Sequence, residues 1–155
     1  MLRKKPTALR TLLRRVFQPS DELVGADSES QLPARIVRRL DTLGERLSAW
    51  VAARQYCHPS PNLDETVRQL GTDKKLLYAY FRLRVGEDFR TWRTRLRLQE
   101  AQRLLRENPD LSASEVSRRT GFNDRSNFSK QFFAHTGMSV TQWRRQEKIE
   151  KKFAD

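Results

Sequence analysis

The sequence contains little cysteine and no long apolar run, and each shortage excludes a class of protein. Its one cysteine, Cys57, excludes an internal disulfide framework and is consistent with a reducing compartment. No apolar run approaches the roughly 20 residues of a membrane-spanning helix. The first 17 residues lack the continuous apolar stretch and the small-residue cleavage site of a secretory signal. We therefore expect a cytoplasmic protein.

Acidic residues are also few relative to basic ones. The chain of 155 residues carries 31 Lys and Arg against 19 Asp and Glu, a formal net charge of +12. This excess favours a polyanionic partner, either nucleic acid or an anionic membrane surface. With 37% hydrophobic residues, the chain can form one or two small domains.

Residue sets for catalysis and for metal binding are missing as well. The sequence contains no glycine-rich phosphate loop, no paired catalytic carboxylates and no Ser/His/Asp set, so we expect no enzyme. Cys57, the adjacent His58 and the distant His135 are too few ligands for a metal site. We expect neither a metal nor another cofactor.

Proline is concentrated in the first part of the chain, and only Pro109 follows residue 61. In that first part, residues 7–17 predict a short basic amphipathic helix, and the Pro- and Ser-containing residues 18–33 predict a flexible linker. Residues 34–55 place apolar side chains at three- and four-residue steps, which predicts a long amphipathic helix that packs on or near the following domain.

The second part contains an internal repeat that its glycines reveal. Gly71 and Gly121 are 50 positions apart, and Gly86 and Gly137 are 51 apart. Each copy predicts a capped helix of about eight residues, a turn entered at glycine and a second helix, which together have the size of a helix-turn-helix. The capping patterns are Asn62-x-x-Glu65 and Ser112-x-x-Glu115.

A long linker helix is predicted between the two copies. Residues 89–107 form one continuous helical pattern that begins after Asp88 and stops before Pro109. Its 19 residues span about 28 Å at 1.5 Å per residue, close to the roughly 34 Å between successive major-groove faces on one side of B-DNA. The predicted fold is all-α, with two helix-turn-helix units joined by a long linker helix and preceded by a long amphipathic helix.

The second helix of each unit, at about 74–83 and 125–134, carries the candidate binding residues. Leu77 and Phe81 define the core side of the first, and Phe128 and Phe132 that of the second. The outward side chains are of types that contact base edges, thymine methyl groups or phosphates, and neither outward face contains Glu. The candidates are Lys75, Tyr78, Ala79, Arg82, Arg125, Ser126, Asn127, Ser129 and Lys130.

Three motifs point to one family. They are FRTWRTRLRLQEAQRLL at 89–105, GFNDRSNFSKQF at 121–132, and Gly137 followed by Trp143-Arg144. Residues 63–145, which include them, resemble the tandem helix-turn-helix DNA-binding domain of the AraC/XylS family of bacterial transcription regulators. The chain departs from the family pattern at four positions, which are Val67 and Ser117 for a customary alanine, Val140 for a frequent proline, and Ala79 for a common polar base-reader.

The resemblance implies a sequence-specific transcription regulator that inserts its two recognition helices into adjacent major grooves. It assigns DNA binding to residues 61–150 and leaves 151–155 as a tail. The implied partners are double-stranded DNA and either RNA polymerase or a sensor domain, and a monomer should suffice for DNA binding. Because Ala79 has no polar group, we expect the second helix to discriminate bases more, with Arg125 and Asn127 on bases and Lys75 on phosphate.

Two other functions remain open from the residues alone. The chain could be a non-specific basic protein that binds nucleic acid, or an interaction module that binds a partner or a second copy through helix 34–54. The basic stretch from Arg3 to Arg15 is a solvated tail, a nucleic-acid arm or a membrane-surface helix. The linker-helix arginines contact either phosphates or other residues of the chain, and Arg97, between Leu96 and Leu98, is expected to be internal.

Overall fold

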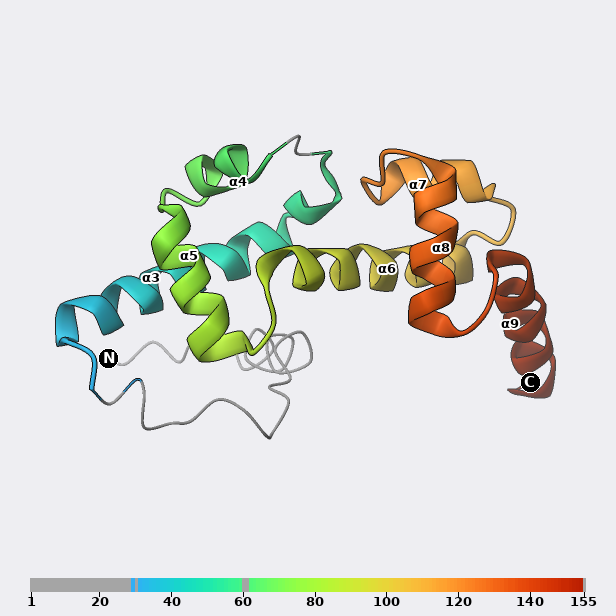
Figure 1. Cartoon of the computed structure of the whole chain (residues 1–155). Helices are drawn as coiled ribbons and strands as arrows, with labels where there is room; N and C mark the ends of the chain where they lie inside the picture. The colour runs from blue at the N-terminus through green and yellow to red at the C-terminus, as the bar shows by residue number, and fades with distance from the viewer. Residues whose placement is uncertain (1–28, 30, 60–61, 155) are drawn as a thin grey trace, which may run out of the picture. The chain divides into compact units, whose positions relative to one another are not determined.

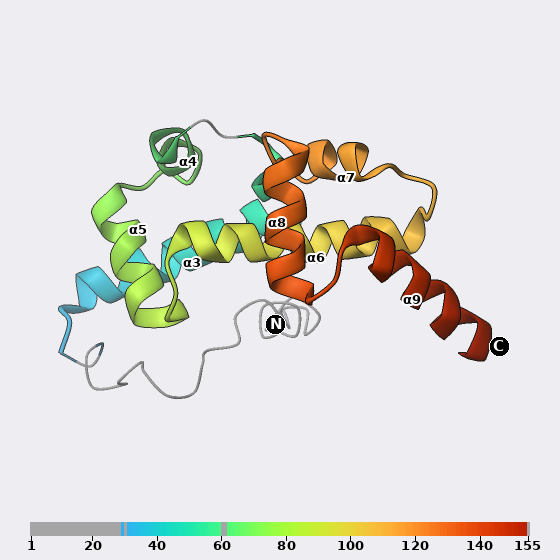
Figure 2. The same ribbon diagram turned by 45° about the vertical axis from the view of Figure 1, so that its right-hand side comes forward.

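A computed structural model describes residues 29, 31–59 and 62–154, so the predicted helix at 7–17 lies outside the described residues, as does most of the linker at 18–33. The described residues form helices and no strand, as the sequence predicted (Figures 1 and 2). None of these helices is long and apolar enough to cross a membrane. The elements are α3 (Ala34–Ala52), η1 (Gln55–Cys57), α4 (Leu63–Gln69), α5 (Lys74–Tyr80), η2 (Phe81–Val85), α6 (Phe89–Glu107), α7 (Ala113–Arg119), α8 (Arg125–Thr136) and α9 (Val140–Ala154).

The chain divides into two compact units, and the division falls inside α6. Unit 1 contains the described residues up to Ala53 and those from Asn62 to Trp92. Unit 2 contains Arg54–Pro59 and the described residues from Arg93 onward. The predicted DNA-binding segment 61–150 therefore contains parts of both units.

The core of unit 1 forms where α3 meets aromatic side chains from the rest of that unit. Leu40, Leu43, Leu47 and Trp50 recur at helical spacing and are all buried. The Trp50 ring lies 6.3 Å from that of Trp92, centroid to centroid, in a stacked arrangement. The apolar face of α3 is thus used inside unit 1, which argues against the interaction module that the sequence left open.

Two predicted helix ends differ from those in the structure. Helix α3 ends at Ala52, before the predicted Gln55, because Arg54 takes a left-handed backbone conformation with φ of 54°. Residues 151–154, expected to be a tail, continue α9 through Ala154. The Lys- and Glu-rich sequence there contains no glycine or proline and has high helix propensity.

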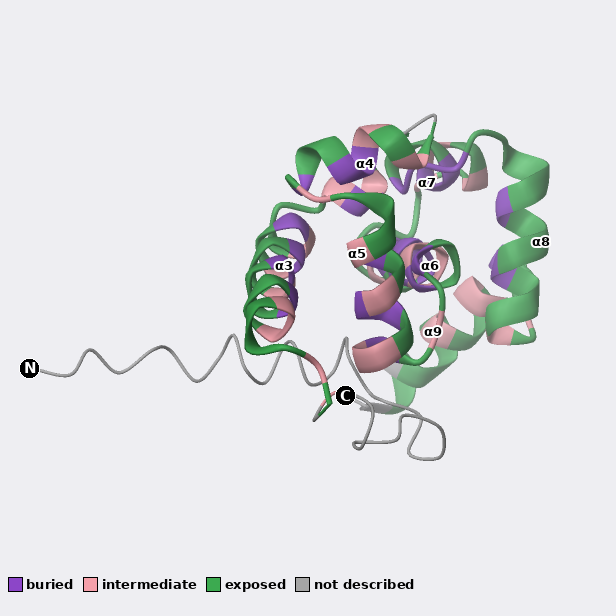
Figure 3. Ribbon diagram, turned by 60° about the vertical axis from the view of Figure 1, so that its left-hand side comes forward, coloured by how far each residue is buried: buried purple, intermediate pink, exposed green. Residues whose placement is uncertain are grey.

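The core of unit 2 is an aromatic cluster between α6, α7 and α8. Phe128 and Phe132 of α8 are fully buried, with ring centroids 5.6 Å apart, and Phe132 lies edge-on to Trp143 of α9. In Figure 3 the buried side of α8 faces α6. Ser117 and Val140, two of the departures from the family pattern, are buried in this unit.

The buried Arg97 attaches the Arg54–Pro59 segment to α6 within unit 2. Its guanidinium donates to the carbonyl oxygens of Tyr56 at 2.6 Å and His58 at 2.9 Å, so the prediction that Arg97 is internal is confirmed. Burial, with a smaller contribution from the neighbouring Arg93, lowers the pKa of Arg97 to about 10. Burial, followed by the Glu100 carboxylate, raises the pKa of the Cys57 thiol to about 11, so the thiol is protonated near neutral pH.

Gly121 is required where this segment meets the turn between α7 and α8. Its φ is +80°, and a Cβ atom at this position would overlap the carbonyl carbon and oxygen of Cys57. Gly137 has a similar φ of +73°, but a Cβ atom there would meet nothing within 4 Å. A substitution at Gly137 therefore adds backbone strain alone, whereas one at Gly121 adds backbone strain and steric overlap.

We expect Gly121→Ala to destabilise the protein more than Gly137→Ala. Each substitution adds left-handed strain of about 1–2 kcal/mol, and the overlap with Cys57 adds about 1–3 kcal/mol in Gly121→Ala alone. Urea unfolding followed by circular dichroism measures both free energies. Equal losses in the two variants would show that the Arg54–Pro59 segment moves aside without cost.

Candidate nucleic-acid interface

Both copies of the repeat are helix-turn-helix units whose helices begin at side-chain caps. In unit 1, Asn62 accepts from the backbone N–H of Glu65 at 3.0 Å, and Asp73, the cap of α5, accepts from that of Leu76 at 2.8 Å. In unit 2, Asp124 caps α8 by accepting from the backbone N–H of Asn127 at 2.7 Å. The caps satisfy amides that lack partners within the helix and define where each second helix begins.

Helix α7 begins with a complete capping box, as its sequence predicted. The hydroxyl of Ser112 accepts from the backbone N–H of Glu115 at 3.1 Å, and the Glu115 carboxylate accepts from that of Ser112 at 2.8 Å. This hydrogen bond from the Ser112 backbone is the largest cause that lowers the pKa of Glu115.

In the first candidate helix, three of the four predicted binding residues are exposed. Leu77 and Phe81 are buried, while Lys75, Tyr78 and Arg82 are exposed and Ala79 is half-buried. The side chain of Tyr78 is 54% exposed, although it is large and aromatic. The α-helix ends at Tyr80 and continues as the π-helical segment η2, which carries Arg82. The predicted helix 74–83 therefore changes its winding before its last residues.

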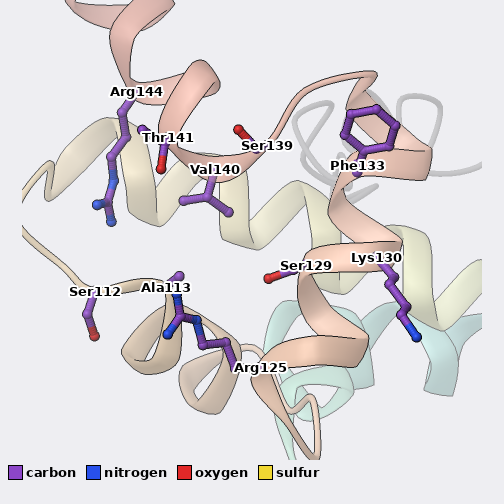
Figure 4. A pocket seen from close by; sticks show the side chains of 10 residues that line it. All are labelled: Ser112, Ala113, Arg125, Ser129, Lys130, Phe133, Ser139, Val140, Thr141 and Arg144. Carbon is purple, nitrogen blue, oxygen red and sulfur yellow. The ribbon is translucent and has the colours of Figure 1, made fainter.

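The second candidate helix, α8, places all five of its predicted residues at exposed positions and runs two residues beyond the predicted end. Arg125, Ser129 and Lys130 line a space bordered by α7 and α9. Arg125 and Ser129 extend into it, whereas the amino end of Lys130 points away from Arg125 and Arg144 (Figure 4). Sequence reasoning did not single out Phe133, which is 55% exposed. Its position directly after the core residue Phe132 was the available signal, because adjacent helical residues cannot both face the core.

This space is a pocket of about 720 Å³ in unit 2, formed by the starts of α7 and α9 and by one side of α8. Its lining contains three cationic side chains and four hydroxyl groups but no carboxylate. Among the described residues, the Nε and Nη2 atoms of Arg144 are buried without a hydrogen-bond partner. The sequence pointed to Arg144 only as part of a family motif. The lining residues are Ser112, Ala113, Arg125, Ser129, Lys130, Phe133, Ser139, Val140, Thr141 and Arg144.

Several arginines of the linker helix α6 have partners within the chain. Arg103 pairs with both Glu100 and Glu107, which raise its pKa, and Arg106 pairs with Glu147 at 3.1 Å. With Arg97 bound to backbone carbonyls, these three side chains have intramolecular roles. The charges of Arg103 and Arg106 are therefore paired with carboxylates, while Arg97 is turned toward the backbone of the chain.

The chain contains two helix-turn-helix units. The second helix of each has an exposed face without acidic side chains. This arrangement defines a tandem helix-turn-helix protein. Residues 66–146 match the family described as "Helix-turn-helix domain". The chain belongs to the AraC-type helix-turn-helix family, whose members carry DNA-binding domains of this kind.

Relatives and a solved structure agree with this assignment. The chain is 35% identical over 82 residues to the HTH-type transcriptional activator RhaR of Salmonella heidelberg and to that of Salmonella typhi. The matched segment covers 53% of this chain and 29% of each relative. The C-terminal domain of AraT, a response regulator from Geobacillus stearothermophilus, has the same fold, with a TM-score of 0.55 and 21% identity over 75% of this chain and 88% of that one.

The capping box of α7 predicts a pH-dependent stability. Because the folded protein lowers the pKa of Glu115, its carboxylate stabilises the fold above the usual Glu pKa, and this stabilisation is lost as the pH falls through the lowered value. We expect the difference in Tm between the wild type and Glu115→Ala to shrink from about pH 7 to about pH 3.5. Glu45→Ala, which removes an exposed carboxylate that caps no helix, is the control. A difference that does not change with pH would contradict the capping role.

Proposed function

We propose that the chain is a sequence-specific DNA-binding transcription regulator that places α5 and α8 in adjacent major grooves. The observation that carries this proposal is the α8 surface, where an outward face of polar and basic side chains adjoins a cationic pocket without carboxylates. Membership of the AraC-type family supports it. RNA polymerase or a sensor domain as a further partner stays a prediction from the resemblance.

The residues of α8 divide into two groups by the direction in which they face. At 100° per residue, Ser126, Asn127 and Lys130 lie opposite the buried Phe128 and Phe132, where a helix in the major groove meets base edges. Asn and Lys are side chains that recognise adenine and guanine there. We propose that these three residues read bases.

Arg125 and Ser129 belong to the second group, which faces the pocket. Because both extend toward the starts of α7 and α9, we propose that they bind a backbone phosphate and not a base. For Arg125 this differs from the role expected from sequence. Helical position alone could not show that a pocket lies beside the first turn of α8.

Arg144 supports a phosphate in this pocket. A buried guanidinium nitrogen without an acceptor costs free energy, because it has lost water and gained nothing in its place. A phosphate oxygen in the pocket would supply the missing acceptor, and Arg125 would share the charge. Arg144 thus makes the free protein less stable and favours the bound state.

The two recognition helices are expected to differ in specificity. Asn127→Ala and Lys130→Ala should each cost about 1–3 kcal/mol on the preferred site and less on random DNA, because each removes a proposed base contact. Lys75→Ala should weaken both complexes by a similar factor. Fluorescence anisotropy measures the affinity for a duplex selected from genomic DNA and for a scrambled duplex, and the ratio of the two affinities gives the specificity of each variant. If Asn127→Ala and Lys130→Ala reduce both affinities equally, α8 does not read bases.

The phosphate role of Arg144 predicts opposite effects on stability and on affinity. Arg144→Met removes two buried guanidinium nitrogens that have no hydrogen-bond partner among the described residues, so we expect an unfolding free energy equal to or above that of the wild type. Affinity for preferred and random duplexes should fall by the same factor, about tenfold or more, for a lost charge-assisted contact. Arg145→Met, which removes a neighbouring exposed guanidinium, is the matched control. An affinity no lower than that of the control would exclude the phosphate contact.

A further inference from the structure

A second basic groove lies in unit 1, and none of the candidate DNA-binding residues assigned above lines it. It has a volume of about 490 Å³ and is formed by one side of α3 and by the turn between α4 and α5. Four arginines of α3 line it, and no carboxylate does. Its lining includes Arg35, Arg38, Arg39 and Arg46 from α3 and Gly71 and Thr72 from the turn.

The four arginines form one stripe along α3. Residues 35, 38, 39, 42 and 46 follow one another at helical steps and lie within an arc of about 100°. The stripe runs for about 16 Å along the helix at 1.5 Å per residue. It is therefore longer than one phosphate group and suits a chain of neighbouring phosphates better than a small anion. Helix α3 lies outside the segment that matches the family.

Two of the arginines hold the stripe against the turn that leads into α5. Arg39 pairs with Asp73, the cap of α5, at 3.1 Å. The Arg46 guanidinium donates to the carbonyl oxygen of Leu70 at 3.1 Å and to that of Gly71. These contacts place the groove directly beside the start of the first recognition helix.

The other two arginines are available to a ligand. Arg35 and Arg38 are exposed, and the guanidinium group of neither has a hydrogen-bond or ion-pair partner among the described residues. Guanidinium groups bind phosphates through two parallel hydrogen bonds, so an exposed pair at adjacent turns of a helix suits two phosphates of one strand.

We propose that the α3 stripe binds the DNA backbone along one edge of the major groove that α5 enters. This inference rests on the proposed function. The major groove is about 12 Å wide, so a helix inside it is bordered on both sides by sugar-phosphate strands. A basic groove that begins at the cap of α5 lies where one of these strands passes. The first unit then contributes to the affinity for DNA more than to the recognition of bases. This agrees with Ala79, whose side chain has no polar group to contact a base.

The test is the double variant Arg35→Gln/Arg38→Gln, with its dissociation constant measured on preferred and random duplexes between about 50 and 200 mM salt. Because each phosphate contact contributes about 0.9 to the slope of log affinity against log salt, the slope should become less steep by about 1.8. Affinity should fall by the same factor on both duplexes. Arg35→Lys/Arg38→Lys should restore the slope, since it keeps the charges.

Lys148→Gln/Lys152→Gln is the matched control, because it removes two exposed charges from helix α9, which belongs to unit 2. A slope for Arg35→Gln/Arg38→Gln equal to that of this control would overturn the inference and leave the proposed function intact. A wild type whose affinity is insensitive to salt and to sequence would overturn the proposed function itself. Inorganic pyrophosphate tests for a small-anion site. If it raises the Tm of the wild type but not that of Arg35→Gln/Arg38→Gln, and the wild type and this variant have the same salt slope on DNA, the stripe binds a small anion and the inference is wrong.

Discussion

Burial of apolar side chains along α6 is the interaction on which both units depend. Its first residues place Phe89 and Trp92 in the core of unit 1, and Leu98, Ala101 and Leu105 belong to the core of unit 2. Large buried aromatic groups contribute most of the area removed from water in such small units. Helices α5 and α8 are held by these cores, because Leu77 and Phe128 face inward and leave the opposite sides of the two helices to solvent.

Arg97 and Arg144 differ in whether their buried guanidinium nitrogens have hydrogen-bond acceptors among the described residues. Arg97 donates to two backbone carbonyls and attaches the Arg54–Pro59 segment to α6, so its charge is used for folding. The buried nitrogens of Arg144 have no acceptor among the described residues, so this side chain is left with hydrogen-bonding capacity for a ligand. Arg97 is buried as a whole and Arg144 only in part, but both place guanidinium nitrogens out of reach of water, and the surrounding acceptors distinguish the two side chains.

Net charge alone therefore gives little information on where a polyanion binds. Arg84, Arg103 and Arg106 pair with carboxylates inside their own units. Arg125 and Arg144 beside α8, and Arg35 and Arg38 along α3, have no such partner among the described residues, and the linings of both pockets lack carboxylates. It is this local imbalance, and not the total of +12, that supports binding to a phosphate backbone.

The sequence by itself determined α3, α6, the two helix-turn-helix units with the caps Asn62 and Ser112, and the outward faces of α5 and α8, because each of these depends on residues within a few positions of one another. The repeat was also visible, because its glycines recur at a constant spacing. It did not show that residues 151–154 extend α9 or that α3 ends at Ala52. Arg97 was expected to be internal, but only tertiary structure decided the partners of Arg103 and Arg106 and brought Ser112, the cap of α7, to one pocket with Arg125 and Arg144. Contacts between residues far apart in the chain leave no periodic pattern, since they arise when whole helices pack.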